Sequence, residues 1–513
     1  MAIPLGYSEL ISRYQLRTLP LWQIAKLDGS IKGREIRQQG GQRIELFEPK
    51  YQPEDSLAGH LQFALRYEGV NLQVLALLFE GTGAEDLTQW LTTNPESRYA
   101  RIACFLYEWL TARELPMADP VSSRSRYVLA VDSEIQCVGA DGIKSQRFRV
   151  INNLPGPREF CPMVFRTEFL KKKQDQDLKN LTIETLARYD QDLLRRAAAY
   201  LYMKETQSSF EVEREKPTPQ RAQRFADLLR QADTRDELSE ERLVELQQAV
   251  VDPRFHEFTW RTQQNWVGKD LGHRHLIDFV PARPEHLPNL MNGLLRMASM
   301  FQSQEHLAQK GAKEYAPFDP VVAAAGIAFG FVFIHPFMDG NGRIHRYLIH
   351  DVLAKAGFTP RGLVLPVSPV ILGNLDEYIS TLEQFSRPLN QMTDYNPDAP
   401  EIPATGNDCV YFQYPDLTVQ VEFLYTALER TVTHDLQKEI DFLLGFDRAS
   451  KALNELLDWP AHDVDIFIRV VQGNNGRLSS NKRKSHFAWM KEDEILQAEV
   501  AVREAFAMTY THR

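Results

Sequence analysis

Apolar residues recur at helical spacing along most of this chain, and two segments instead show the pattern of strands. Leu, Ile and Phe residues three or four positions apart predict helices over residues 55–65, 97–113, 178–204 and 285–302. The run Val321 to Ile334 is apolar at nearly every position, which predicts a helix buried on all sides. β-Prone stretches joined by turn residues, from Arg126 to Val150 and from Arg261 to Pro281, predict two hairpins. The pattern as a whole indicates a mainly α protein.

Turn and linker signals divide the chain into parts. Thr218 followed by Pro219 is typical of a helix start, and the proline-rich stretch Arg387 to Asp408 is typical of a linker. A short strand is expected over Val410 to Val421. We therefore expect an N-terminal helical domain (1–125), a hairpin and helical connector (126–204), a core (205–390), and a C-terminal helical domain (391–513) for which a winged-helix-like fold is one option.

Composition excludes several classes of protein. The chain has 513 residues with 59 Lys and Arg against 69 Asp and Glu, a net charge of −10, so it has no overall positive field to attract nucleic acid. Its four cysteines have no spacing typical of zinc ligands or redox pairs. The first residues lack a basic and apolar export signal, and no apolar run reaches the ~20 residues that span a bilayer. We expect a cytoplasmic protein with no membrane partner.

Chemistry is concentrated in the stretch His335-Pro-Phe-Met-Asp-Gly-Asn-Gly-Arg-Ile-His-Arg346. Gly340 and Gly342 permit positive φ and close backbone approach, so that successive amides can point at one anion. Arg343 and Arg346 fall on one face of the helix that follows and suit a di- or triphosphate.

Two further side chains of this stretch suit group transfer. Asp339 could hold magnesium together with phosphate oxygens and water. A neutral His335 could take a proton from an attacking hydroxyl, which accelerates such reactions by ~10²–10⁴. The combination predicts transfer of a phosphate-containing group.

Other motifs are weaker. No Walker-type phosphate loop is present. His345 and His350 diverge by about 140° on a helix and so are a poor metal pair. His273 and His275 are more typical of surface residues than of metal ligands, and Lys171–Lys173 of a solvated helix face.

The stretch from His335 to Arg346 is similar to the signature of the Fic family, H-P-F-x-[D/E]-G-N-G-R-x-x-R, at every specified position. The hairpin around residues 261–281 resembles the Fic target-docking flap, which would include Val267 and Gly268. The resemblance covers roughly residues 205–390 and implies a Fic-type helical core with a β-hairpin flap. It also implies transfer of AMP from ATP to a Ser, Thr or Tyr hydroxyl of a target protein, which the sequence does not identify.

The resemblance assigns roles to the site residues. His335 would be the general base and Asp339 the Mg²⁺ ligand. The backbone of Gly340 and Gly342, with Asn341, would cradle phosphates. Arg343 would hold the phosphate chain and Arg346 the terminal phosphate of ATP. Tyr378 matches a family tyrosine near the adenine.

Many Fic proteins carry an inhibitory helix, [S/T]-x-x-x-E-[G/N], whose glutamate pairs with the second motif arginine. Ser209 to Glu213 fits the first five positions, although Arg214 stands where Gly or Asn belongs. Glu68 with Gly69 has the right ending but lacks the Ser or Thr. We favour Glu213 as the inhibitory residue, and the neighbouring cation predicts leaky inhibition.

Alternatives remain open from the sequence. The same base, metal and glutamate could support removal of AMP from a target. A non-enzymatic regulator would use the pocket as an ATP sensor and bind DNA or a partner through Lys482, Arg483 and Lys484, although a solvated helix start is the favoured interpretation of that cluster. The sequence also leaves open a homodimer.

Overall fold

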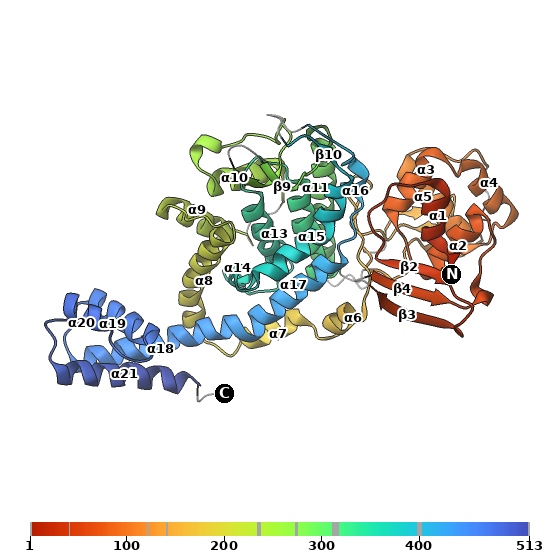
Figure 1. Ribbon diagram of the computed structural model, residues 1–513. Helices are drawn as coiled ribbons and strands as arrows, with labels where there is room; N and C mark the ends of the chain where they lie inside the picture. The colour runs from red at the N-terminus through yellow and green to blue at the C-terminus, as the bar shows by residue number, and fades with distance from the viewer. Residues whose placement is uncertain are drawn as a thin grey trace.

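The protein has three regions arranged in a row (Figure 1). This computed structural model describes residues 3–39, 42–118, 121–122, 124–139, 142–232, 237–271, 275–309, 318–397 and 403–510. An N-terminal domain lies at one end, a helical core lies in the middle, and a C-terminal helical module projects from the other end. Among the described residues no helix has the length and apolarity needed to cross a membrane.

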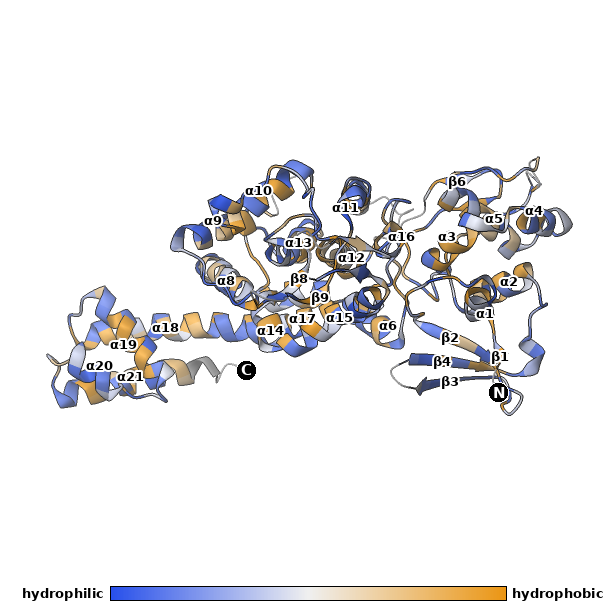
Figure 2. Ribbon diagram, turned by 45° about the horizontal axis from the view of Figure 1, so that its top comes forward, coloured by the Kyte–Doolittle hydropathy of each residue, from blue (hydrophilic) through white to orange (hydrophobic). Residues whose placement is uncertain are grey.

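The N-terminal domain combines helices with a sheet that the sequence analysis missed. The sheet has the order β1-β2-β4-β3. Its strands are β1 (Ile3–Pro4), β2 (Gln23–Leu27), β3 (Arg34–Gln39) and β4 (Gln42–Phe47). The outermost strand, β3, is largely hydrophilic (Figure 2), so it gives no apolar alternation from which a strand could be predicted.

Five helices accompany this sheet and form a core of their own. They are α1 (Gly6–Tyr14), α2 (Leu57–Tyr67), α3 (Leu72–Gly81), α4 (Ala84–Thr93) and α5 (Arg98–Thr111). Ser56 and Ser97 accept hydrogen bonds from the first turns of α2 and α5, as their sequence positions indicate.

The connector differs from the sequence prediction in two ways. The strands β5 (Val128–Leu129), β6 (Lys144–Ser145) and β7 (Val150–Ile151) form a sheet of order β5-β7-β6 in which β5 and β7 run parallel, so the predicted hairpin is wrong. The single helix predicted over 178–204 is two helices, because Asp190 starts a new one. The helices here are α6 (Glu168–Asp175), α7 (Leu178–Leu186) and α8 (Gln191–Val212).

The middle of the molecule is built around a helix that is buried on every side. This helix is α12 (Pro320–Ile334), and its apolar residues are almost all within the largest hydrophobic cluster. Two helices of this region pack directly on it, α11 (Leu287–Gln309) and α13 (Asn341–Lys355). The region also contains α9 (Pro219–Arg230), α10 (Glu240–Val250), α14 (Val367–Gly373) and α15 (Leu375–Met392). Thr218 caps α9, as predicted. Short 3-10 turns occupy Pro49–Tyr51, Pro253–Phe255 and Pro284–His286.

The second predicted hairpin is confirmed. Strands β8 (Val267–Asp270) and β9 (His275–Phe279) pair antiparallel at the edge of the core. The turn residues Gly272 and His273 lie outside the described residues.

The core continues beyond residue 390. The expected boundaries at 204 and 390 fall inside α8 and α15, and Pro388 lies within α15. The strand expected over Val410–Val421 is wrong, because α16 (Cys409–Gln413) and the start of α17 (Thr418–Arg430) occupy it. Strands β10 (Asp394–Tyr395) and β11 (Ala404–Thr405) form a small ribbon before them.

The C-terminal module is helical, as expected. A π-helical turn, Thr431–Asp435, joins α17 to the long α18, from which the module projects (Figure 1). It contains α18 (Leu436–Leu456), α19 (Ala461–Gly473), α20 (Ser480–Ser485) and α21 (Glu492–Tyr510). Lys482, Arg483 and Lys484 are exposed on the short α20.

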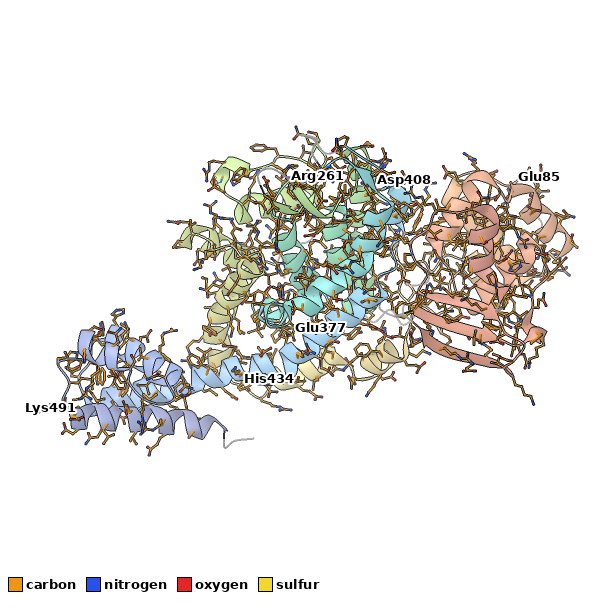
Figure 3. The ribbon with its side chains drawn as sticks, in the orientation of Figure 1. Glu85, Arg261, Glu377, Asp408, His434 and Lys491 are labelled. Atoms are coloured by element: carbon orange, nitrogen blue, oxygen red, sulfur yellow. The ribbon has the colours of Figure 1, made fainter. Side chains whose placement is uncertain are left out.

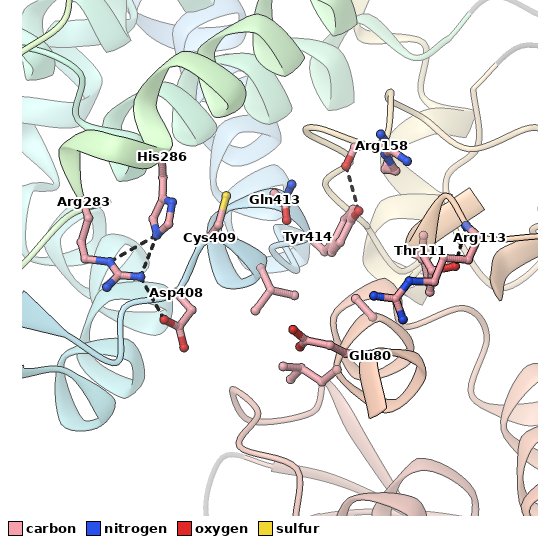
Figure 4. A pocket seen from close by; sticks show the side chains of 14 residues that line it. Glu80, Thr111, Arg113, Arg158, Arg283, His286, Asp408, Cys409, Gln413 and Tyr414 are labelled. Carbon is pink, nitrogen blue, oxygen red and sulfur yellow. Dashed lines mark hydrogen bonds and ion pairs between the residues drawn. The ribbon is translucent and has the colours of Figure 1, made fainter. Parts of the chain in front are cut away.

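A cleft of about 590 Å³ separates the N-terminal domain from the core (Figure 4). Glu80 and Arg113 line it from the N-terminal side, and Arg283 and Asp408 form an ion pair on the other. None of its lining residues belongs to the stretch 335–346, so the candidate chemistry lies elsewhere.

Candidate active site

The loop between α12 and α13 carries the candidate chemistry. His335 ends α12 in the left-handed conformation, with φ 58° and ψ 61°, and the helix cannot continue through Pro336. Phe337 is fully buried and anchors the loop. Gly340 precedes α13 with φ 92°, the conformation for which glycine was expected. Gly342 does not have a positive φ, and it serves close approach instead: an added Cβ would overlap Glu213 Oε1.

Two asparagines fix the shape of the loop. The side chain of Asn341 accepts from the Phe337 amide at 3.1 Å and donates to the Phe337 carbonyl at 2.8 Å. Asn265, just before β8, donates to the carbonyls of Phe337 and Met338 at 3.0 Å each. The Asn341 side chain therefore faces the loop interior, so the contribution of this turn to anion binding comes from backbone N–H groups at the start of α13.

Arg261 holds the His335 end of the loop in place. It lies at the hairpin end of the core, where Figure 3 labels it. Its guanidinium donates to the carbonyls of His335 at 2.8 Å, Gln263 at 2.7 Å, and Ala282. Burial lowers the pKa of this arginine to about 10.

The Glu257 side chain holds the same loop by binding backbone amides of the loop. Its carboxylate accepts from the Met338 amide at 2.8 Å, and burial raises the pKa of this group. Sequence reasoning missed Glu257, Arg261 and Asn265 as site residues, although the polar run 261–268 was noted as part of a hairpin.

His335 is held ready to accept a proton. Its Nδ1 lies 3.0 Å from the Val332 carbonyl oxygen, which can only accept, so the proton is assigned to Nδ1 and the lone pair to Nε2. Burial lowers the pKa of His335 to about 4, so the imidazole is neutral near pH 7.

The two motif arginines are buried and paired with carboxylates. Arg343 contacts Asp339 Oδ1 at 2.8 Å and also pairs with Glu215. Arg346 pairs with Glu213 Oε1 at 2.9 Å and donates to Ser209 Oγ at 2.8 Å and to its carbonyl at 2.6 Å. The contact between Glu213 and Arg346 is the one that the sequence analysis favoured.

Helix α8 reaches the site by running antiparallel along α13. Three contacts are spaced four residues apart on both helices: Glu205 with His350 at 2.7 Å, Ser209 with Arg346, and Glu213 over Gly342. Four residues is about one turn, so these residues share one face of each helix. The helix end expected at residue 204 is wrong, because this register carries α8 on to Val212.

The end of α8 explains the unusual residue after Glu213. The Arg214 amide bonds to the Glu211 carbonyl at 2.8 Å and the Glu215 amide to the Phe210 carbonyl at 3.0 Å, which is a Schellman motif. Arg214 occupies its left-handed position with φ 58°. Glycine or asparagine is favoured there because it has the least steric cost.

Part of the chain matches one known family. Residues 237–353 match the model of the Fic/DOC family. The chain carries a Fic domain. Protein adenylyltransferase fic-1 of Caenorhabditis briggsae is 32% identical over 107 residues, which are 21% of this chain and 17% of that protein. Protein adenylyltransferase Fic of Nematostella vectensis is 36% identical over 83 residues, which are 16% of this chain and 17% of that protein.

A solved structure shares the Fic description. A Fic domain containing signaling protein from Bacteroides thetaiotaomicron is 19% identical and covers 52% of this chain and 96% of its own, with a TM-score of 0.35. The chain matches less than a quarter of the length of the curated adenylyltransferases named above.

The Fic domain has unsatisfied donors where a polyphosphate is expected. Arg343 Nε and Arg346 Nη1 are buried and have no hydrogen-bond partner within the described part of the chain. Buried donors of this kind are costly unless a ligand completes them. The Asp339 side chain is about half exposed, so its carboxylate can be reached by a cation.

The donor set also limits how magnesium could bind. No cluster of three or more His, Cys, Asp or Glu side chains suited to a metal occurs in the ranges that the structure covers. A single carboxylate fits Mg²⁺ only if phosphate oxygens and water supply the other ligands. The residues present therefore fit magnesium that arrives with a nucleotide.

The remaining predicted residues lie in three places. Tyr378 is buried, and its hydroxyl interacts with Arg346 rather than lying open to a base. Val267 is exposed on the hairpin, and Gly268 beside it forms a β-bulge so close to the Leu276 carbonyl that a Cβ would overlap it. Glu68, the alternative inhibitory residue, caps α1 through the Tyr7 amide in the N-terminal domain.

Proposed function

We propose that this Fic domain transfers AMP from ATP to a hydroxyl of a target protein and that Glu213 restrains the reaction. The observation that carries the proposal is the arrangement of a neutral His335 and two buried arginines around one amide-rich turn. Two curated relatives of the domain are named protein adenylyltransferases, which supports the same chemistry.

The reaction divides among the side chains as follows. The target hydroxyl oxygen bonds to the α-phosphorus of ATP, the bond from that phosphorus to the bridging oxygen breaks, and pyrophosphate leaves. His335 Nε2 accepts the hydroxyl proton. The amides at the start of α13 and the guanidiniums of Arg343 and Arg346 stabilise the phosphate charge. Magnesium held by Asp339 and the phosphates would neutralise the leaving group.

Glu213 competes with the terminal phosphate of ATP for the Arg346 guanidinium. Its carboxylate pairs with Arg346 and lies over Gly342, at the N-terminus of α13. A polyphosphate seated on the same arginine would meet a like charge, so productive binding requires Glu213 to move away.

The test is transfer of label from α-labelled ATP to captured target protein. Glu213→Gly should raise incorporation over the wild type, and Glu213→Gln, which keeps the size but not the charge, should raise it less. Adding His335→Ala to Glu213→Gly should abolish incorporation. The mass of the product identifies both the transferred group and the acceptor side chain.

Two results would contradict the proposal. One is equal incorporation by Glu213→Gly with and without His335. The other is loss of AMP from a pre-modified target without any transfer from ATP, which would make the domain a hydrolase of the modified protein.

A further inference from the structure

Glu215 bridges two buried arginines from different helices. One carboxylate oxygen, Oε1, lies 2.9 Å from Arg221 Nη2 on α9, and the other, Oε2, pairs with Arg343 Nη1 on α13. Arg343 also donates to the Val250 carbonyl at 2.8 Å, and Arg221 donates to the same oxygen. The two guanidiniums are therefore neighbours that share both a carboxylate and a carbonyl.

The two arginines are buried, whereas Glu215 is partly exposed. Their guanidinium carbons lie 5.3 and 5.2 Å from the centre of the Phe210 ring, and both residues are more than nine-tenths buried. The Glu215 side chain is 36% exposed, so solvent reaches part of it. The anion can therefore be exchanged without rearranging the cations.

Arg221 and Arg343 together have more hydrogen-bond donors than Glu215 can pair. Nε of Arg221 and Nε of Arg343 are both buried without a hydrogen-bond partner in the described structure. Two adjacent buried guanidiniums need an anion between them, and a phosphate offers more acceptor oxygens than a carboxylate. A carboxylate with one oxygen on each arginine thus stands in for two oxygens of a phosphate.

We propose that Arg221 and Arg343 form a two-arginine subsite for the polyphosphate of the nucleotide, which Glu215 occupies in the resting state. This inference rests on the proposed function, and it adds Arg221 to the binding residues and Glu215 to those that hold the site closed. The Schellman turn at Arg214 lets the acidic residues on either side of it reach α13. Glu213 contacts Arg346 and Glu215 contacts Arg343, and the two arginines are one helical turn apart.

The test is nucleotide binding by titration calorimetry, with ATP, pyrophosphate and AMP as probes. All samples are the full chain carrying Glu213→Gly, so that no Glu213 carboxylate competes for Arg346 in any of them. Arg221→Gln should weaken ATP and pyrophosphate about ten- to hundredfold, because a charge-assisted hydrogen bond is lost, and should leave AMP unchanged. Arg221→Lys should restore part of the affinity. Glu215→Gln should tighten ATP and pyrophosphate.

Matched controls separate local from general charge effects. Arg224 is exposed on the same helix as Arg221, and Glu211 is exposed one turn before Glu215, so Arg224→Gln and Glu211→Gln should leave all three affinities unchanged. Thermal unfolding identifies a variant that has not folded, and Glu215→Gln, at a partly exposed position, then carries the test.

The outcomes distinguish this inference from the proposed function. Equal ATP affinity in Glu215→Gln and its parent, or a fall in AMP affinity equal to that of ATP in Arg221→Gln, overturns the subsite. If polyphosphate binding responds as expected but no label reaches any target, the subsite stands and AMP transfer is wrong.

Discussion

Replacement of Arg214 by glycine should tighten the restraint on the Fic domain. Arg214 is the left-handed residue of the Schellman motif that ends α8, directly after Glu213. A residue with a Cβ in this conformation is strained by ~1 kcal/mol relative to glycine. If that strain is relieved when the segment leaves α13, glycine stabilises the closed state by the same amount, which is about fivefold in the closed-to-open ratio.

Alanine is the control that separates strain from charge. Arg214→Ala removes the cation beside Glu213 but keeps the Cβ, so its basal transfer should match that of the wild type. Arg214→Gly should lower basal transfer about fivefold. The assay measures label transferred from ATP to the target protein by chains that keep Glu213. The Glu213→Gly chain gives the maximal, unrestrained level for comparison.

Two results would refute the reasoning. If alanine and glycine lower basal transfer equally, the guanidinium rather than the backbone weakens the inhibition, as the sequence alone had indicated. If neither variant differs from the wild type, the turn persists when Glu213 leaves Arg346, and strain has no part in the equilibrium.

Three further predictions concern the loop and the helix pair. Because the pKa of His335 is lowered to about 4, kcat/KM of Glu213→Gly should stay constant from pH 7.5 to 5.5, and a fall centred near 6.5 would exclude this histidine environment. Gly340→Ala forces a Cβ to within 3.0 Å of Val250 and Val251 at φ 92°, so transfer should fall at least tenfold while nearly all of the fold is retained, as judged by circular dichroism. Glu205→Ala should speed hydrogen exchange in the last turns of α8 and raise basal transfer, because the helix loses a buried anchor.

The helices that could be predicted from the sequence are those that a local sequence pattern specifies. α12 was predictable because it is apolar on every side, and α9 because Thr218 and Pro219 mark its start. The strand predicted over Val410–Val421 failed because its aromatic and β-branched residues suit strands, whereas the spacing of Val421, Leu424 and Leu428 is helical and all three are buried in the core.

The same distinction holds in the site. The signature loop and the pairing of Glu213 with Arg346 were predictable, because the family pattern specifies both. The roles of Glu215 and Glu257 were not, because each depends on a partner more than 80 residues away that only the packing of helices brings near. Isolated charged residues in a polar segment carry no signal of that kind.

The position of Glu213 depends on the helix register more than on the residue that follows it. Glu205 binds His350 and the Ser368 amide in the interior, and Ser209 binds Arg346 one turn later. The next turn of α8 therefore brings Glu213 against Gly342 of α13. Loss of the buried Glu205 contacts costs ~1–3 kcal/mol, against ~1 kcal/mol for the strain at Arg214. Glu205→Ala should therefore raise basal transfer by at least as much as Arg214→Gly lowers it, and the reverse order would place control of the site in the turn rather than in the helix pair.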